Sequence, residues 1–146
     1  MAAYEVITAT GPWPDRYTFS PAVRAGNLLF ISGTTATDES GQIVGPDSIV
    51  GQTRYIFQKF ERLLKAAGAG FEHVVQTTEY ITTTENYRKT ADVRREFFKG
   101  PFPTATGVIV KGLLREGALI EISAVAVLPA DAPHMKGSVS REEGPE

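Results

Sequence analysis

The sequence contains no cysteine and only two histidines. Without thiols the chain can form no disulfide, no zinc–thiolate site and no cysteine nucleophile. The two histidines, His73 and His134, lie far apart in the sequence, and neither forms a metal-ligand pattern with nearby acids. We therefore expect no metal and no cofactor.

Long apolar segments and a surplus of basic charge are also missing. The longest apolar runs, near LLFI and VAVL, are far shorter than the about 20 residues of a membrane-spanning helix. The first residues, MAAYEVITAT, lack the basic and apolar regions of a signal peptide. The net charge of −2 and the pI of about 5.7 disfavour a nucleic-acid-binding face. These features predict a cytoplasmic protein that binds neither a membrane nor a nucleic acid.

The length of 146 residues suits one domain. We assign residues 1–129 to that domain. Residues 130–146 are polar and rich in Pro, Gly, Ser and Glu, which is typical of a flexible tail or of an ordered surface strap.

The first half of the domain reads as a hairpin followed by a helix. Two short apolar runs, Ala22–Ala25 and Leu28–Ser32, flank Gly26-Asn27, which is the spacing of a tight β-hairpin. Asp47 or Ser48 can then cap a helix whose apolar residues recur at the 3.6-residue period. Gly68 is placed to end that helix.

The second half predicts a strand, a helix and two more strands. The segment His73–Thr82 is rich in β-branched and aromatic residues. Thr83 or Thr84 is expected to cap the second helix, and Gly100-Pro101 to end it. The last two strands are predicted at 104–111 and 119–128.

The predicted order is ββαβαββ, an α+β fold with both helices on one face of the sheet. The other face has no cover within the chain, and an exposed apolar face of that size normally marks an interface. Association through this face is therefore expected.

Several segments together resemble the reactive intermediate deaminase (RidA/YjgF) family from about Ser20 to Pro129: AGNLLFISGTT, LLKAAGAGFEHVVQTTEYI, YRKTADVRREFFKGPFPTATGVIV and LIEISAVAV. The resemblance implies a chorismate-mutase-like fold, packed as a homotrimer around a central barrel, with sites in clefts between subunits. The best-known members hydrolyse reactive enamines and imines, such as 2-aminoacrylate, to a 2-oxo acid and ammonia. Others have been described as nucleases or as ligand-binding stress proteins.

Two residues match the family's site. Gly33 stands where the family uses a backbone group, and Glu121 matches the acid that positions or activates water. Other positions depart from the family pattern, above all the arginine that holds the substrate carboxylate. The replacements are Ala105 for this arginine, Gly107 for a cysteine, Ala91 for an asparagine and Phe19 for a tyrosine. The chain thus resembles the arginine-lacking subgroups.

The two candidate acids carry open alternatives. Glu121 lies between isoleucines in a strand, and a carboxylate beside apolar residues tends to have a raised pKa, which suits acid–base catalysis. Alternatively, it binds backbone amides at a subunit junction. Glu79 is either a second site carboxylate beside Glu121 or the partner of Arg94 or Arg95 in an ion pair.

The remaining candidates could contact a small-molecule substrate. Tyr80 and Tyr87 could donate hydrogen bonds to it, Phe19 could form an apolar wall, and Ala105 and Thr106 lie near the expected cleft; packing is the alternative role for the aromatic residues. A replacement for the missing arginine could be Arg24, Arg54 or Arg115.

Three functions remain open at this point. The first is a cofactor-free enamine or imine deaminase, a hydrolase, in which Glu121 assists water attack. The second is a small-molecule-binding trimer with little turnover. The third, a ribonuclease or translation inhibitor, is disfavoured by the acidic pI.

Overall fold

The structure is a computed structural model that describes residues 2–132 and 140–142. It contains a seven-stranded mixed sheet, two α-helices and two short 3₁₀ helices. In chain order the elements are β1 (Ala2–Ile7), β2 (Ala22–Ala25), β3 (Leu28–Thr34), α1 (Ile49–Ala66), η1 (Phe71–His73), β4 (Val74–Ile81), η2 (Tyr87–Lys89), α2 (Thr90–Phe97), β5 (Thr104–Ile109), β6 (Ile120–Val127) and β7 (Ser140–Glu142).

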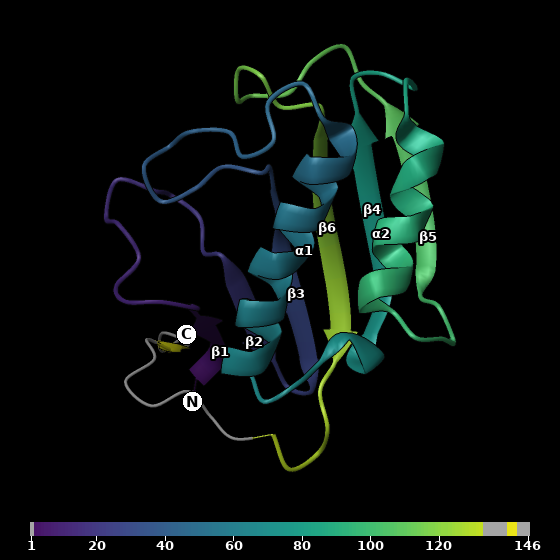
Figure 1. Cartoon of the computed structure of the whole chain (residues 1–146). Helices are drawn as coiled ribbons and strands as arrows, with labels where there is room; N and C mark the ends of the chain where they lie inside the picture. The colour runs from purple at the N-terminus through teal and green to yellow at the C-terminus, as the bar shows by residue number, and fades with distance from the viewer. Residues whose placement is uncertain (1, 133–139, 143–146) are drawn as a thin grey trace.

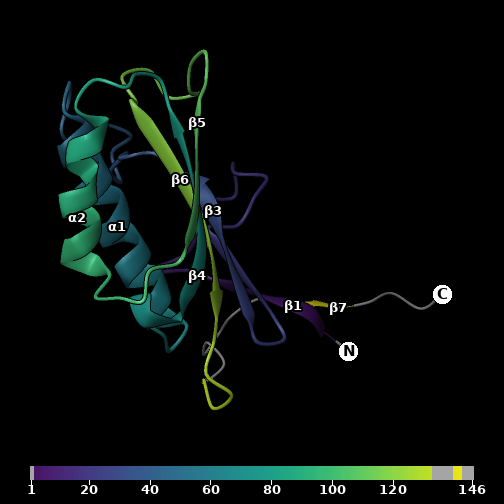
Figure 2. The same cartoon turned by 90° about the vertical axis from the view of Figure 1, so that its right-hand side faces the viewer.

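The strands lie in the order β5-β4-β6-β3-β2-β1-β7 (Figure 1). Only β4 and β5 pair in parallel. Both α-helices cover the same face of the sheet (Figure 2). The α+β class and the ββαβαββ core are therefore confirmed. The sequence analysis missed strand β1 and the edge strand β7, and β7 falls inside the segment expected to be a tail or a surface strap.

Local signals explain the hairpin and the first helix. Gly26 adopts a φ of +61° in the turn between β2 and β3, a conformation that glycine tolerates best. The Ser48 side chain accepts a hydrogen bond from the Gly51 amide at 2.9 Å and so caps α1. Asp47, the other candidate cap, has a positive φ of 62° and precedes the cap.

The second helix begins later than predicted. The Thr83 hydroxyl accepts a hydrogen bond from the Glu85 amide, which forms a local turn instead of a helix cap. The chain then passes through Asn86 at a φ of 60° and through η2 before α2 starts at Thr90. The Thr83 hydroxyl thus binds the Glu85 amide within a turn and does not cap a helix.

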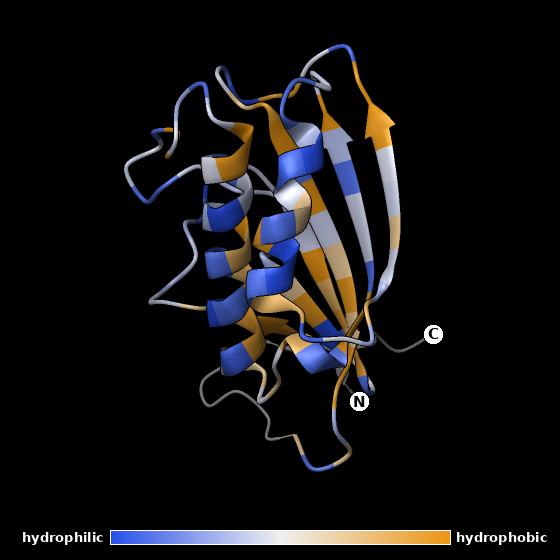
Figure 3. Ribbon diagram, turned by 45° about the vertical axis from the view of Figure 1, so that its right-hand side comes forward, coloured by the Kyte–Doolittle hydropathy of each residue, from blue (hydrophilic) through white to orange (hydrophobic). Residues whose placement is uncertain are grey.

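The hydrophobic core fills the space between α1 and the sheet. The helix contributes fully buried Ile56, Phe57, Phe60 and Leu64. The inward residues of β3 and β6 meet them, among them Leu29 and Ile122. Figure 3 shows the corresponding pattern, with hydrophilic residues on the outer sides of both helices. This packing fixes the central strands that carry the candidate site.

The opposite face of the sheet is uncovered and partly apolar. Phe30 on β3 lies opposite Val125 on β6, and Leu28 lies opposite Val127. Phe30 is 45% exposed. Aromatic and aliphatic side chains on a continuous sheet face are typical of a surface that another chain covers.

Candidate functional site

Gly33 and Glu121 meet where β3 ends and β6 begins. The pairing of β3 with β6 shifts register between Ile31 and Thr34, so Gly33 lies in an irregular stretch of the strand. A Cβ atom on Gly33 would lie 2.7 Å from Oε2 of Glu121. The carboxylate thus occupies the space beside the glycine backbone, which only a residue without a side chain leaves open. Strand irregularities of this kind are frequent next to active sites.

The Glu121 side chain belongs to the uncovered face of the sheet. Along β6, buried Ile120 and Ile122 alternate with half-buried Glu121 and Ser123. Tyr80 on β4 lies directly opposite Glu121, so the two side chains share this face. Thr106 on β5 pairs with Thr78, which lies two residues before Tyr80 on β4, so the Thr106 side chain is on the same face. Glu121, Tyr80 and Thr106 are therefore brought to one surface.

Phe19 lies beside the Gly33 end of this surface. The Ser32 hydroxyl donates a hydrogen bond to the carbonyl of Ser20 at 2.6 Å, and the Ser32 amide donates to Pro21 at 3.0 Å. These bonds hold the segment that carries Phe19 against the residue before Gly33. The Phe19 ring is 52% exposed. An apolar wall next to Glu121 is compatible with this position.

Glu79 is not a second carboxylate of the same site. Its pairing partner on β6 is Ile122, so Glu79 points to the helix-covered face, away from Glu121. It is only 2% exposed. The expectation that the two acids share one site is therefore wrong.

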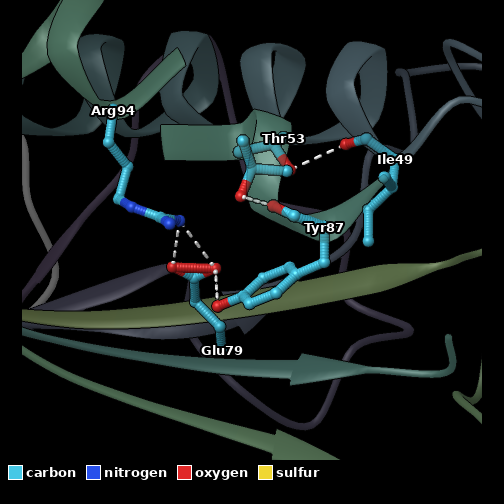
Figure 4. A network of polar contacts seen from close by, with 6 residues as sticks. Ile49, Thr53, Glu79, Tyr87 and Arg94 are labelled. Carbon is cyan, nitrogen blue, oxygen red and sulfur yellow. Dashed lines mark hydrogen bonds and ion pairs between the residues drawn. The ribbon is translucent and has the colours of Figure 1, made fainter. Parts of the chain in front are cut away.

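The alternative prediction for Glu79, an ion pair with α2, is confirmed for Arg94 (Figure 4). Arg94 Nη1 lies 2.7 Å and 3.1 Å from the two oxygens of Glu79, and the Tyr87 hydroxyl donates a hydrogen bond at 3.1 Å. Burial raises the pKa of Glu79, and both partners act against that rise. Arg95 instead pairs with Asp92. Tyr87 thus serves this network and does not reach the surface of Glu121.

Ala105 and Gly107 also lie on the helix-covered side of the sheet. They pair with the buried Thr77 and Glu79 of β4. A Cβ atom on Gly107 would lie 3.1 Å from the Tyr87 hydroxyl oxygen. The absence of a side chain at Gly107 therefore makes room for the tyrosine that binds Glu79. Ala105 and Thr106, both predicted to contact substrate, project to opposite faces.

Two of the three candidate replacement arginines are engaged elsewhere. Arg24 donates to the carbonyls of Gly26 and Ala132, and Arg54 forms an ion pair with Glu96 at 2.8 Å. Arg115, on the loop that leads into β6, approaches the Tyr17 hydroxyl at 3.5 Å. Arg115 is thus the candidate that lies closest to Glu121 in the sequence.

Lys59 is a feature of the site region that sequence reasoning missed. Its ammonium group donates to the Thr34 hydroxyl at 2.6 Å and to the carbonyls of Thr35 and Thr37 at 3.0 Å and 3.1 Å. It therefore ties α1 to the end of β3, next to Gly33. Burial lowers the pKa of Lys59 to about 8. In the sequence this lysine looks like one more residue of a solvated helix face.

The described part of the chain holds no group of three or more His, Asp and Glu side chains placed to bind a metal ion. Within the same residues, no helix is long and apolar enough to cross a membrane.

The family model described as "Endoribonuclease L-PSP" matches residues 14–128, most of the chain. The chain belongs to this family, that of the RidA/YjgF proteins. A RutC family protein of Pyrococcus horikoshii is 36% identical over 122 residues, which cover 83% of this chain and 94% of the relative.

Solved structures of this family share the fold. A Rid-family protein of unknown function, YyfA from Yersinia pestis, is 32% identical with a TM-score of 0.77, over 86% of this chain and 100% of that one. RidA from an Antarctic Psychrobacter is 24% identical with a TM-score of 0.74, over 84% and 98% of the two chains, and supports the fold alone. The predicted RidA/YjgF membership and chorismate-mutase-like fold are confirmed.

Proposed function

We propose that this RidA/YjgF protein is a cofactor-free hydrolase that converts a small enamine or imine to the carbonyl compound and ammonia. The observation that carries the proposal is the contact of Glu121 with the Gly33 backbone on the uncovered face of the sheet. An acid beside an open backbone group can activate water and leave space for a planar substrate.

The chemistry needs only one acid–base group. The Glu121 carboxylate takes a proton from water as the water oxygen forms a bond to the imine carbon. The C=N π pair moves to nitrogen, Glu121 returns its proton to that nitrogen, and a neutral tetrahedral amino alcohol results. Glu121 then takes the proton of the new hydroxyl group and passes it to the nitrogen, so that the C–N bond breaks and ammonia leaves as the C=O bond forms. A backbone N–H at Gly33 would stabilise the negative charge that develops on oxygen.

The proposal includes a homotrimer. The exposed apolar side chains of the sheet face, such as Phe30 and Val127, need cover, and a second copy offers the same surface. Glu121, Tyr80 and Thr106 lie on that same face. A neighbouring subunit would therefore turn an open surface into a cleft and keep bulk water away from the reacting atoms.

The test is a coupled deaminase assay. Purified protein is added while 2-aminoacrylate and bulkier imines are generated from amino acids in the cuvette, and release of the 2-oxo acid is followed. We expect the wild-type protein to accelerate release, and Glu121→Ala to lose about 100-fold or more of the acceleration because the general acid–base group is gone. Glu61→Ala, on the exposed side of α1, is the matched control and should behave like wild type.

Two results would count against the proposal. If no imine is turned over faster with wild-type protein than without it, a binding role for the same site becomes the better account. If Glu121→Ala keeps full activity, another group carries the chemistry. Several relatives carry endoribonuclease names, so parallel incubation with single-stranded RNA tests that activity directly; the net charge of −2 disfavours it.

A further inference from the structure

Gly33 lies between two residues whose positions are fixed by side-chain hydrogen bonds. On one side, the Ser32 hydroxyl donates to the carbonyl of Ser20 at 2.6 Å. On the other side, the Lys59 ammonium group donates to the Thr34 hydroxyl at 2.6 Å. Gly33 itself falls in the stretch where the pairing of β3 with β6 shifts register, so the regular ladder does not set its position. The side-chain bonds of its two neighbours therefore take over that task.

Lys59 uses all of its donors on this one segment. An ammonium group has three N–H bonds, and here it meets three acceptors: the Thr34 hydroxyl at 2.6 Å and the carbonyls of Thr35 and Thr37 at 3.0 Å and 3.1 Å. All three acceptors are neutral, so the lysine acts here as a hydrogen-bond donor and not as half of an ion pair. A neutral amine has only two N–H bonds. Loss of the proton therefore leaves one of the three acceptors without its lysine donor.

Burial is the main reason why the ammonium group holds its proton weakly, because it lowers the pKa of Lys59 to about 8. Arg62 on α1 and Arg115 on the loop before β6 act in the same direction, and Asp38 on the loop after β3 opposes them. The Asp38 carboxylate is engaged in its own turn, where it accepts hydrogen bonds from the Ser40 amide and hydroxyl at 2.9 Å and 2.7 Å. The third donor is thus present at neutral pH and is lost as the pH rises through the pKa of the lysine.

The path of the backbone at Gly33 decides what the Glu121 carboxylate meets. Its oxygen Oε2 lies only 2.7 Å from where a Cβ of Gly33 would be. If the anchor at Thr34 is lost, the irregular stretch of β3 is free to shift relative to β6. A displacement of about 1 Å between catalytic groups is enough to lower a rate about 100-fold.

We propose that Lys59 is a positioning residue, which holds the end of β3 so that the Gly33 backbone faces the Glu121 carboxylate. The ammonium group contacts no reacting atom and acts only through its three threonine acceptors. The importance of this position for turnover rests on the proposed function, whereas the control of the strand end rests on the contacts of Lys59 alone.

The first measurement follows the strand end directly and needs no substrate. Protein labelled with ¹³C at the glycine α-carbon gives an NMR signal for each of the 14 glycines, and Gly33 is assigned by the signal that Gly33→Ala lacks. We expect the Gly33 signal of the wild-type protein to move with pH, with a midpoint at about pH 8. In Lys59→Met it should not move over this range. Lys65→Met, the same change at an exposed position of α1, should behave like wild type.

The second measurement is the pH profile of turnover in the coupled assay. For the wild-type protein we expect kcat to fall as the pH rises through about 8, with a much smaller change in KM, because alignment is lost and binding is kept. Lys59→Met should lower kcat about 10-fold to 100-fold at neutral pH and show no such fall. Thr34→Val should lower kcat less. The double variant should be no worse than Lys59→Met, because both changes remove the same hydrogen bond.

A Gly33 signal that does not move with pH, or one that moves alike in wild type and Lys59→Met, would overturn the inference. So would a wild-type kcat in Lys59→Met. A Gly33 signal that follows the protonation of Lys59 in a protein without imine turnover would reject the proposed reaction and leave the role of Lys59 at the strand end standing.

Discussion

At the scale of single residues, Gly33 shows how a missing side chain can serve chemistry. The glycine leaves the space in which Oε2 of Glu121 lies, 2.7 Å from where a Cβ would be. The atom that would be displaced is the far end of a flexible side chain. An added methyl group would therefore shift the carboxylate more than the strand.

We expect Gly33→Ala to retain wild-type stability to within about 1 kcal/mol, because the glutamate can turn aside. We also expect it to lose most deaminase activity, since the carboxylate no longer reaches its position at the strand end. Urea denaturation and the coupled assay measure the two effects on the same sample. Full activity would mean that the contact with Gly33 does not matter for turnover; Gly112→Ala, where a Cβ meets no atom within 4 Å, is the control.

Residue-level prediction from sequence succeeded unevenly for physical reasons. Gly33 and Glu121 were recognisable through the family resemblance, and the structure brings them together. Arg115 and Tyr17 meet only because two loops fold against each other, and loop paths leave no periodic pattern in a sequence. Lys59 was hidden for a similar reason, because its acceptors are carbonyls of a separate segment.

At the scale of secondary-structure elements, the buried network of Glu79, Tyr87 and Arg94 fastens α2 to the outer part of the sheet. The acid comes from β4, and its two partners come from η2 and α2. Glu79 is almost fully buried, whereas Arg94 is 24% exposed. Removing only the arginine would leave a buried carboxylate with a single hydroxyl partner.

We expect Arg94→Met to destabilise the protein by about 3 kcal/mol, the lower end of the range for a broken buried ion pair, because Arg94 keeps some contact with water. The double variant Glu79→Gln/Arg94→Met should recover much of this loss, since no uncompensated charge remains and the amide can still accept from Tyr87. Urea unfolding at a fixed protein concentration measures both. Equal destabilisation of the single and double variants would contradict the role of buried charge.

Burial raises the pKa of Glu79 in the folded protein above its value in the unfolded chain. Ionisation of this carboxyl therefore lowers the stability of the folded state. Its contribution to stability is present below the unfolded pKa and declines as the pH rises through the folded value. In urea unfolding at acidic and at neutral pH, the free energy of unfolding of the wild type, relative to that of the Glu79→Gln/Arg94→Met variant, should therefore decrease as the pH rises.

The elements themselves were mostly accessible from the sequence. The hairpin, α1, β4, β5 and β6 follow from apolar periodicity and from glycine and serine signals at their ends. The start of α2 was misplaced because Thr83 binds a turn amide, a use of the same side chain that capping rules do not separate. Strands β1 and β7 were missed because they pair with each other from opposite ends of the chain, and β7 has only three residues within a polar segment.

At the scale of the whole molecule, the sheet has one face sealed by helices and one face open. The open face joins an apolar part around Phe30 to a polar part around Glu121. A trimer would use the first for assembly and the second for the site. Assembly and catalysis should therefore fail together when the apolar part is disrupted.

We expect Phe30→Asp to abolish trimer formation, because it places a charge on the apolar face that the proposed trimer buries. Light scattering after size exclusion should show a mass near that of one 15.8 kDa chain, in place of three times that mass for the wild-type protein, and the coupled assay should show a matching loss of activity. Gln58→Asp, which adds the same charge to the exposed side of α1, should leave both unchanged. A wild-type protein that runs as a monomer would refute the assembly.

The close approach of Tyr87 to Gly107 also constrains how this sequence can evolve. A side chain at position 107 would start 3.1 Å from the tyrosine hydroxyl, whose hydrogen bond belongs to a buried acid. A side chain at position 107 therefore requires the Tyr87 hydroxyl to move by a few tenths of an ångström, and loss of Tyr87 in turn leaves Glu79 with Arg94 as its remaining partner. Substitutions at positions 79, 87 and 107 should therefore be coupled: the effect of changing one depends on which residues occupy the other two.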